Sequence, residues 1–182
     1  MEENKEDRRV RRTRRLLKQG LAELMEEKEF KNITVKDITE RMDLNRGTFY
    51  LHYRDIYDLS DSLQKELIQD ILQSLDQPKL FLSDTTAFTS ALFYAFSDHH
   101  SMIEILFSGS QSAILPLSIE KELKEYIFKI IPSARDNAKF NILLTYQILG
   151  GYHAYQQYYP NYGIDYIVDV IKEITGNSLP TL

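Results

Sequence analysis

Residues 34–53 carry the pattern that most constrains the fold of this chain, because they predict two short helices joined by a tight turn. Thr34 and Asp37 have the spacing of a capping box, which marks the start of the first helix. The turn falls at Asp43-Leu44. Asn45 follows as a strong N-cap, so the second helix begins directly after it. The segment therefore predicts a compact helical hairpin whose second helix is capped at a defined residue.

The second helix has the properties that a DNA recognition helix requires. A buried anchor is predicted from Ile38, Leu44 and Phe49, and Gly47 removes a side chain where the helix would approach a duplex. Arg46 suits guanine in the major groove, and nearby hydroxyl and imidazole groups suit phosphate oxygens. An ordinary helical hairpin is the alternative. We expect DNA contacts from Thr34, Val35, Asn45, Arg46, Gly47, Thr48, Tyr50, Leu51 and His52.

A run of arginines precedes this segment. At about 100° per residue, one face of a helix would hold Arg8, Arg11, Arg12, Arg15 and Lys18. Of these we expect Arg8, Arg11 and Arg12 to contact phosphates or the minor groove and to raise affinity without adding specificity. The alternative is a solvated surface that the acidic residues before position 8 partly neutralise.

The charge is divided unevenly along the chain. Residues 1–54 hold 14 Lys and Arg against 11 Asp and Glu, whereas residues 55–182 hold 8 against 16. The formal net charge of −5 therefore conceals a basic N-terminal part and an acidic remainder. This distribution favours phosphate attraction at the predicted recognition segment and repulsion elsewhere.

Other chemistries find little support in the sequence. Cysteine is absent, which excludes disulfides and thiolate nucleophiles and suits a reducing cytoplasm. The four histidines lack metal-binding spacing, and residues 109–112 do not form a nucleophile elbow. We therefore expect no enzyme activity, no metal and no cofactor. No run of 18 apolar residues predicts a membrane span and no signal peptide is seen, so we expect a cytoplasmic protein without membrane contact.

The rest of the chain predicts an all-α protein of about nine helices. The N-terminal domain would cover residues 1–54, and residues 55–182 would supply a linker helix and a helical bundle for dimerisation and effector binding. Gln77-Pro78 precedes the bundle, and Gly163 and Gly176 suit turns or helix ends. Apolar periodicity and prolines place helices at about 8–28, from 35, from 46, 56–75, 85–97, 100–108, 115–131, 135–158 and 163–175.

Residues 8–60 resemble the DNA-binding domain of the TetR family of bacterial transcription regulators. The motif is also similar to a Firmicutes-type subgroup. The residues that carry the resemblance are Thr34, Val35, Ile38, the stretch Leu44-Asn45-Arg46-Gly47-Thr48-Phe49-Tyr50, His52, Tyr53, Asp55 and Leu59. The remainder fits the family only in size and helicity.

The chain departs from the family pattern at two positions. Asp43 stands where the family usually turns on glycine, but aspartate tolerates left-handed geometry, so the turn should form. Ile56 stands where many members place a lysine that touches phosphate, which isoleucine cannot do. Arg54 is the candidate to compensate, and it joins the expected DNA contacts.

A single recognition helix contacts too little DNA for useful specificity, so we expect a homodimer on a palindromic operator. Gly150 and Gly151 cost about 1 kcal/mol each inside a helix, which favours close approach of another helix there. The resemblance implies that the last two long helices pair across the dimer; packing within one chain is the alternative. The expected interface residues are Tyr146, Leu149, Gly150, Gly151, His153, Ile167 and Ile171.

The sequence thus predicts a DNA-binding transcription regulator, a repressor released or modulated by a small-molecule effector. The effector is implied by the family and by the many aromatic residues of the predicted bundle, although plain core packing explains the same residues. The alternative is a regulator, activator or architectural DNA-binding protein that answers to a protein partner or to no ligand.

Overall fold

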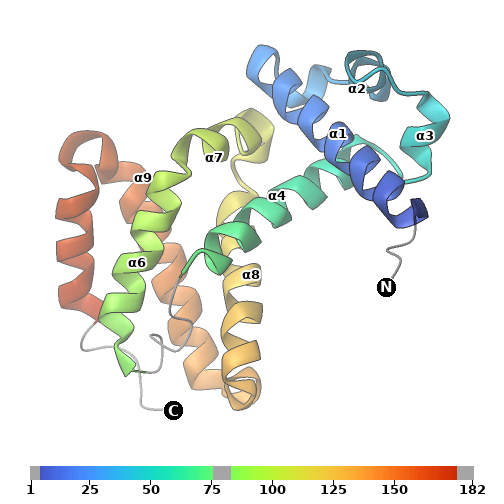
Figure 1. Cartoon of the computed structure of the whole chain (residues 1–182). Helices are drawn as coiled ribbons and strands as arrows, with labels where there is room; N and C mark the ends of the chain where they lie inside the picture. Colours follow the sequence, from blue (N-terminus) through green and yellow to red (C-terminus); the bar gives the residue numbers. More distant parts are fainter. Residues whose placement is uncertain (1–4, 76–82, 176–182) are drawn as a thin grey trace. The chain divides into compact units, whose positions relative to one another are not determined.

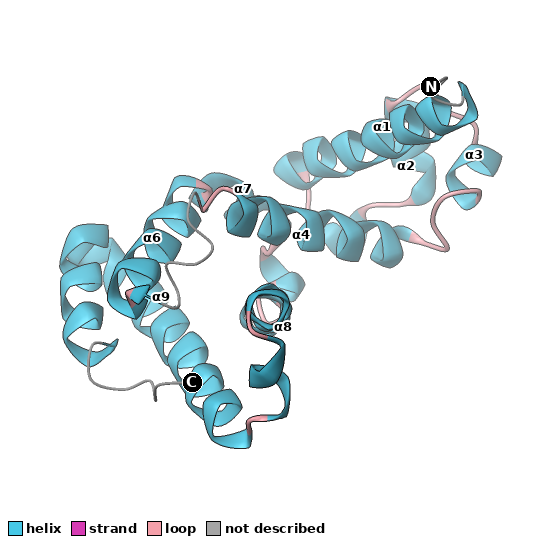
Figure 2. Ribbon diagram, turned by 60° about the horizontal axis from the view of Figure 1, so that its bottom comes forward, coloured by secondary structure: helices cyan, strands magenta, loops and turns pink. Residues whose placement is uncertain are grey.

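The computed structural model describes residues 5–75 and 83–175, and the regular structure within those ranges is helical throughout (Figure 2), which confirms the predicted all-α class. Three short 3-10 turns lie at η1 (Phe30–Asn32), η2 (Gly109–Gln111) and η3 (Pro132–Asp136). The predicted positions Gln77-Pro78 and Gly176 lie outside the described residues. The α-helices are α1 (Lys5–Glu27), α2 (Val35–Arg41), α3 (Arg46–Tyr50), α4 (Ile56–Gln73), α6 (Thr85–Asp98), α7 (His100–Leu106), α8 (Leu115–Ile130) and α9 (Ala138–Thr175) (Figure 1).

The chain forms two compact units, and neither is continuous in sequence. The first unit consists of residues 1–66 together with 101–113, and the second of residues 67–100 together with 114–182. Helix α4 contributes residues to both. The predicted division after residue 54 concerns which part contacts DNA rather than which residues pack together, and it stays a prediction.

The core of the first unit forms around the predicted apolar stripe of α1. Leu17 and Leu21 are fully buried, and Leu24 and Met25 are nearly so. A side chain at Gly20 would place its Cβ only 2.7 Å from Cγ of Met42, so the glycine lets α2 pack closely on α1. This close approach fixes the platform on which α3 is held.

The second unit buries one face from each of its long helices. Its core includes Ile71 of α4, Phe88 of α6, Ile127 of α8 and Phe140 of α9. The rings of Phe88 and Tyr126 stack at 6.4 Å between centroids. Helices α6, α8 and α9 thus pack around a shared core, as expected of amphipathic helices.

Residues 138–175 form two helical segments that meet at a kink, which agrees with the two helices predicted at 135–158 and 163–175 apart from the first few residues. Residues 132–136 form the turn η3, and α9 begins only at Ala138. Helix α9 then passes Pro160 and continues to Thr175, but Gly163 has φ 73° and ψ 172°, which no α-helix contains. The predicted break is therefore a sharp change of direction at Gly163 alone, visible between the orange and red parts of α9 in Figure 1.

Candidate nucleic-acid interface

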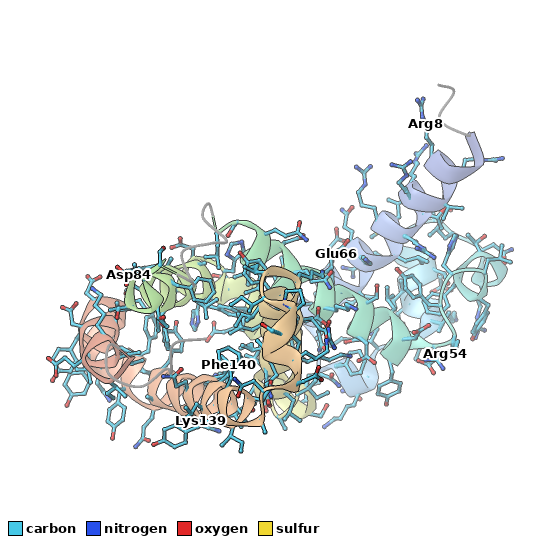
Figure 3. All side chains as sticks on the ribbon, turned by 90° about the horizontal axis from the view of Figure 1, so that it is seen from below. Arg8, Arg54, Glu66, Asp84, Lys139 and Phe140 are labelled. Atoms are coloured by element: carbon cyan, nitrogen blue, oxygen red, sulfur yellow. The ribbon has the colours of Figure 1, made fainter. Side chains whose placement is uncertain are left out.

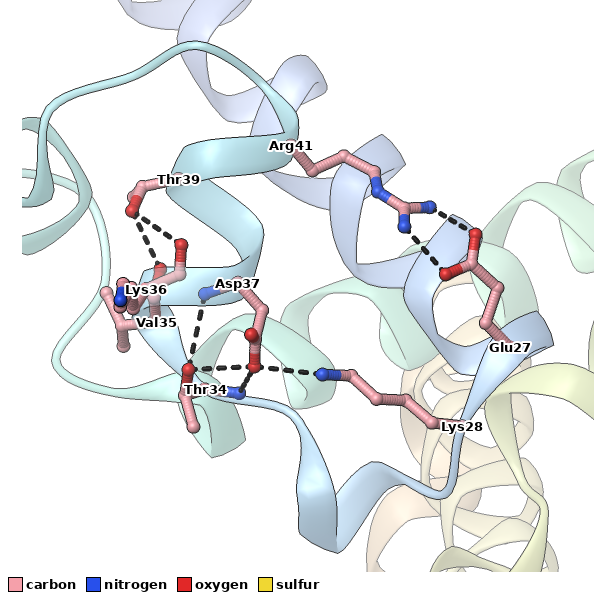
Figure 4. Close-up of polar contacts among 8 residues, drawn as sticks. All are labelled: Glu27, Lys28, Thr34, Val35, Lys36, Asp37, Thr39 and Arg41. Carbon is pink, nitrogen blue, oxygen red and sulfur yellow. Dashed lines mark hydrogen bonds and ion pairs between the residues drawn. The ribbon is translucent and has the colours of Figure 1, made fainter.

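The start of α2 is closed by the predicted capping box, drawn in Figure 4. Thr34 Oγ1 accepts the amide of Asp37 at 3.2 Å, and Asp37 Oδ2 accepts both the amide and the hydroxyl of Thr34 at 2.8 Å. Lys28 Nζ lies 3.0 Å from the same carboxylate. The contacts of Lys28 first and Thr34 second lower the pKa of Asp37 to about 2. The Thr34 hydroxyl is therefore already engaged at the helix start.

Helix α2 is fastened to α1 by an ion pair that the sequence did not indicate. Both terminal nitrogens of Arg41 lie 2.6 Å from the carboxylate oxygens of Glu27, a bidentate arrangement. Arg41 also lies 3.9 Å from Glu23. The hydrogen bond from Arg41 lowers the pKa of Glu27. Together with the tight packing at Gly20, this pair fixes the orientation of α2 within the first unit.

The turn between α2 and α3 has the predicted geometry. Asp43 has φ 51°, in the left-handed region where aspartate is tolerated. The amide of Leu44 donates to the carbonyl of Thr39 at 2.8 Å, which closes the turn. Asn45 caps α3, because its Oδ1 accepts the amide of Gly47 at 2.7 Å. The arrangement of α2, turn and α3 is that of a helix-turn-helix.

Helix α3 is held by aromatic packing on one side. Phe49 and Ile38 are fully buried, and Leu44 is half-buried. The Phe49 ring lies 6.0 Å from that of Tyr53 and makes an edge-to-face contact with Tyr50 at 5.4 Å. A helix of five residues has little stability of its own, so this buried ring is what fixes its outer face.

The rest of the α3 surface is exposed, and it holds most of the predicted DNA contacts. Arg46 and Gly47 are exposed, as are Tyr50 and Leu51 at 54% and 81%. Arg46 makes no ion pair with any residue in the described ranges, so its guanidinium is available to a ligand. Asn45 is exposed at the cap, Val35 and Thr48 are half-buried, and His52 is half-buried at the far end.

The end of α3 lies near the first turns of α1. Burial and the positive charge of Arg14 lower the pKa of His52 below its ordinary value, so the imidazole is neutral at pH 7. Figures 1 and 2 both show α3 beside the N-terminal half of α1. A neutral imidazole can still donate one hydrogen bond to a phosphate oxygen.

The arginines of α1 form a basic surface. Arg8, Arg11, Arg12 and Arg15 line one open surface, and all four residues are exposed. Arg8 extends outward from the start of α1 in Figure 3. Lys18, which the sequence placed on the same face, instead pairs with Glu66 of α4. The basic surface is therefore made of these four arginines, without Lys18.

The start of α4 carries acidic residues where a phosphate-binding lysine was missing. Asp55 Oδ1 accepts the amide of Asp58, and Asp58 Oδ2 accepts the amide of Arg54 at 3.0 Å. The guanidinium of Arg54 is 86% exposed but lies 3.5 Å from Asp58. Ile56 is half-buried. Arg54 therefore meets any phosphate as part of an ion pair, which weakens the compensation expected from it.

The residues predicted for a dimer interface differ in exposure within the second unit. Tyr146, Gly150 and His153 are exposed, and a Cβ added to Gly150 would meet nothing within 4 Å. Leu149 and Ile171 are half-buried. By contrast, Ile167 is only 4% exposed, because it packs inside its own unit. Gly151 faces α6, where its Cβ would lie 3.0 Å from Cζ of Phe93.

A buried polar cluster in the first unit was not predicted. Gln64 is 2% exposed, and its Nε2 donates to the carbonyl of Leu106 at 2.8 Å and lies 3.3 Å from Oε1 of Gln111. This cluster holds residues 101–113 against α4. No local pattern indicates its partners, because Leu106 and Gln111 lie 42 and 47 positions further along the chain.

Residues 5–75 and 83–175 hold neither a membrane-spanning helix nor a metal-binding cluster. No helix in these ranges is long and apolar enough to cross a membrane. No group of three or more histidine or acidic residues in the same ranges is placed to hold a metal ion.

The capped turn, the anchored α3 and the arginine surface define a helix-turn-helix unit suited to DNA. Over 70 residues the chain is 34% identical to the HTH-type transcriptional regulator YxbF of Bacillus subtilis (strain 168), itself described as uncharacterized. The match covers 38% of this chain and 18% of that protein, so the chain spans less than a fifth of its relative's length. No protein-family model matches the chain. The likeness and the geometry both support a DNA-binding transcription regulator.

Proposed function

We propose that this chain is a TetR-like repressor that binds a palindromic operator as a homodimer and is released by a small-molecule effector. The observation that carries the proposal is the outer face of α3. Phe49 fixes the helix by its burial, while Arg46, Gly47 and Tyr50 are exposed. This arrangement lets the backbone approach base edges, and the arginines of α1 add phosphate attraction nearby.

The test is genomic footprinting with the purified 182-residue chain. The expected result is protection of a short site whose two halves are related by two-fold symmetry. Arg46→Ala should lose about 1–3 kcal/mol at one base position of each half-site and relax the preference there. Lys121→Ala, which removes an exposed positive charge in the second unit, is the matched control. Unchanged preference in Arg46→Ala would assign base contact to another residue, and absence of any protected site would contradict the proposal.

The proposed dimer surface is an exposed apolar face of α9. Before Gly163 it includes Ile142 and Tyr146, which are 69% and 74% exposed, and after Gly163 it includes Tyr166 and Val170, which are 57% and 42% exposed. The spacing of four residues in each pair puts its members on one face of a helix. Contact with a second copy would remove these side chains from water. Because Ile167 is buried within its own unit, Tyr166 and Val170 replace it in the proposed interface.

An effector would bind the second unit between α6 and α9. There Phe93 lies 6.3 Å from Tyr155, which stacks on Tyr159 at 4.7 Å. The Nε2 atom of Gln147 is buried and has no hydrogen-bond partner among the described residues, so a ligand with an acceptor oxygen would satisfy it. Because α4 belongs to both units, a ligand could bias the first unit through it. An inducing ligand and the operator must then weaken each other's binding equally.

The alternative is a regulator or architectural protein that senses no small molecule. A panel of metabolites screened against the purified protein on its operator separates the two. Release of operator by one ligand supports the repressor with an effector. Insensitivity across the panel would favour control by a protein partner or constitutive binding, and activation of a reporter by the bound protein would overturn the assignment as a repressor. The expected cytoplasmic location also stays a prediction.

A further inference from the structure

Leu51 lies at the end of α3 and is 81% exposed, the highest value among the large apolar side chains of the described residues. It has helical backbone angles, and its amide donates to the carbonyl of Gly47 at 3.3 Å, so it continues the path of α3. Stability gives no reason for a leucine there, since its side chain contributes almost nothing to the core. Leu51 is therefore available to contact whatever α3 approaches.

Leu51 and Gly47 lie at the outermost line of α3. Each is two residues from the buried Phe49, so they lie about 160° from it around the helix axis in opposite senses and face away from the core. Gly47 has no side chain, so the helix can approach a surface closely at its first turn. Leu51, one turn later, is then the side chain that reaches deepest into whatever α3 enters.

A leucine side chain can neither donate nor accept a hydrogen bond. In the major groove the one apolar group on the standard base edges is the C5-methyl of thymine. We propose that Leu51 determines specificity by packing on a thymine methyl in each operator half-site. Arg46 lies five residues earlier, about 7.5 Å along the helix axis and about 140° around it, so the two side chains contact different bases.

The inference rests on the proposed DNA-binding function and deepens it, so the experiment separates the two. Once the operator is known, each thymidine is replaced in turn by deoxyuridine, which removes the methyl and leaves the pairing edge unchanged. Dissociation constants are measured by fluorescence anisotropy for the 182-residue wild type, Leu51→Ala and Leu117→Ala. The last variant truncates a leucine of α8 that is 61% exposed and serves as the control.

The expected result is that one thymine position in each half-site loses about fourfold in wild-type affinity on replacement, the effect of one buried methyl. That loss should persist in Leu117→Ala and vanish in Leu51→Ala. If the operator is bound selectively but Leu51→Ala shows the same methyl dependence as wild type at every position, the inference fails and the proposed function stands. If the wild type selects no sequence, both fail. Leu51 is too exposed for its truncation to threaten folding.

Discussion

Gly151 of α9 lies against the ring of Phe93 on α6, so closely that a Cβ added to the glycine would meet Phe93 Cζ at 3.0 Å. Its neighbour Gly150 has open space around the same position. The two glycines therefore have different reasons to be there. Gly151 serves packing inside the second unit, the alternative left open by the sequence, and only Gly150 is free to face a partner helix.

Substitution of Gly151 by alanine should expose this difference. The added methyl forces Phe93 to move, which costs about 1–3 kcal/mol and offsets the roughly 1 kcal/mol that alanine gains in a helix. We expect Gly151→Ala to lower the free energy of unfolding in urea, and Phe93→Leu to relieve part of the loss. Additive effects of the two substitutions would show that the glycine and the ring do not interact.

The capping box of α2 should make stability depend on acid. The pKa of Asp37 is lowered in the folded chain to about 2, from about 4 in the unfolded chain. The contribution of its carboxylate to the free energy of unfolding is therefore fully present above pH 4 and is lost as the pH falls toward 2. Asp37→Asn should be less stable than wild type in urea at pH 6, and the gap should narrow by pH 3. Asp61→Asn, at an exposed position of α4, should show no such narrowing.

The arginine surface of α1 should govern salt dependence rather than sequence preference. Replacing Arg8, Arg11 and Arg12 by glutamine should reduce the slope of log K against log salt by about 0.9 for each phosphate that the variant no longer neutralises. Operator and random duplex should be affected alike. The control replaces three exposed lysines of the second unit, Lys121, Lys129 and Lys139, by glutamine. An unchanged slope in the arginine variant would assign these residues to a solvated surface.

The environment of His52 can be followed by NMR. Because burial and Arg14 both lower the pKa of His52, its ring should titrate below 6.5 in the folded chain, and Arg14→Gln should shift the titration upward. The unfolded chain binds this proton first as the pH falls, so the stability due to neutral His52 is present above pH 6.5 and declines below it. A titration unaffected by Arg14→Gln would show that the two side chains are not neighbours in solution.

The proposed dimer surface can be tested at its most exposed aromatic residue. Tyr146→Glu puts a charge on the apolar face of α9 without touching the core, because Tyr146 is 74% exposed. Sedimentation equilibrium should show a dimer for wild type and a monomer for the variant, with weaker operator binding. Leu117→Glu, an equally drastic change on α8, should leave the dimer intact. A dimer that survives Tyr146→Glu and dissociates in Leu117→Glu would move the interface away from α9.

The parts of the fold that followed from the sequence are those set by short-range chemistry. The caps at Thr34 and Asn45 involve residues two or three positions apart, so spacing alone predicts them. The pairing of Lys18 with Glu66, 48 positions away, depends on how helices pack and leaves no local pattern. The burial of Ile167 was missed for the same reason, since an apolar stripe does not say which neighbour covers it.

The hydrogen bond from Gln64 to the carbonyl of Leu106 has a consequence for how such a chain can be divided or inherited. The first unit needs residues 101–113, which are encoded between α6 and α8, in the middle of the second unit. A fragment cut after Glu66 would leave the buried amide of Gln64 without its hydrogen-bond acceptors. It would also lack η2, which contacts η1. The first unit is therefore not a continuous segment that a single crossover can exchange. Any recombination that transfers residues 1–66 must also transfer residues 101–113, which complete the same unit.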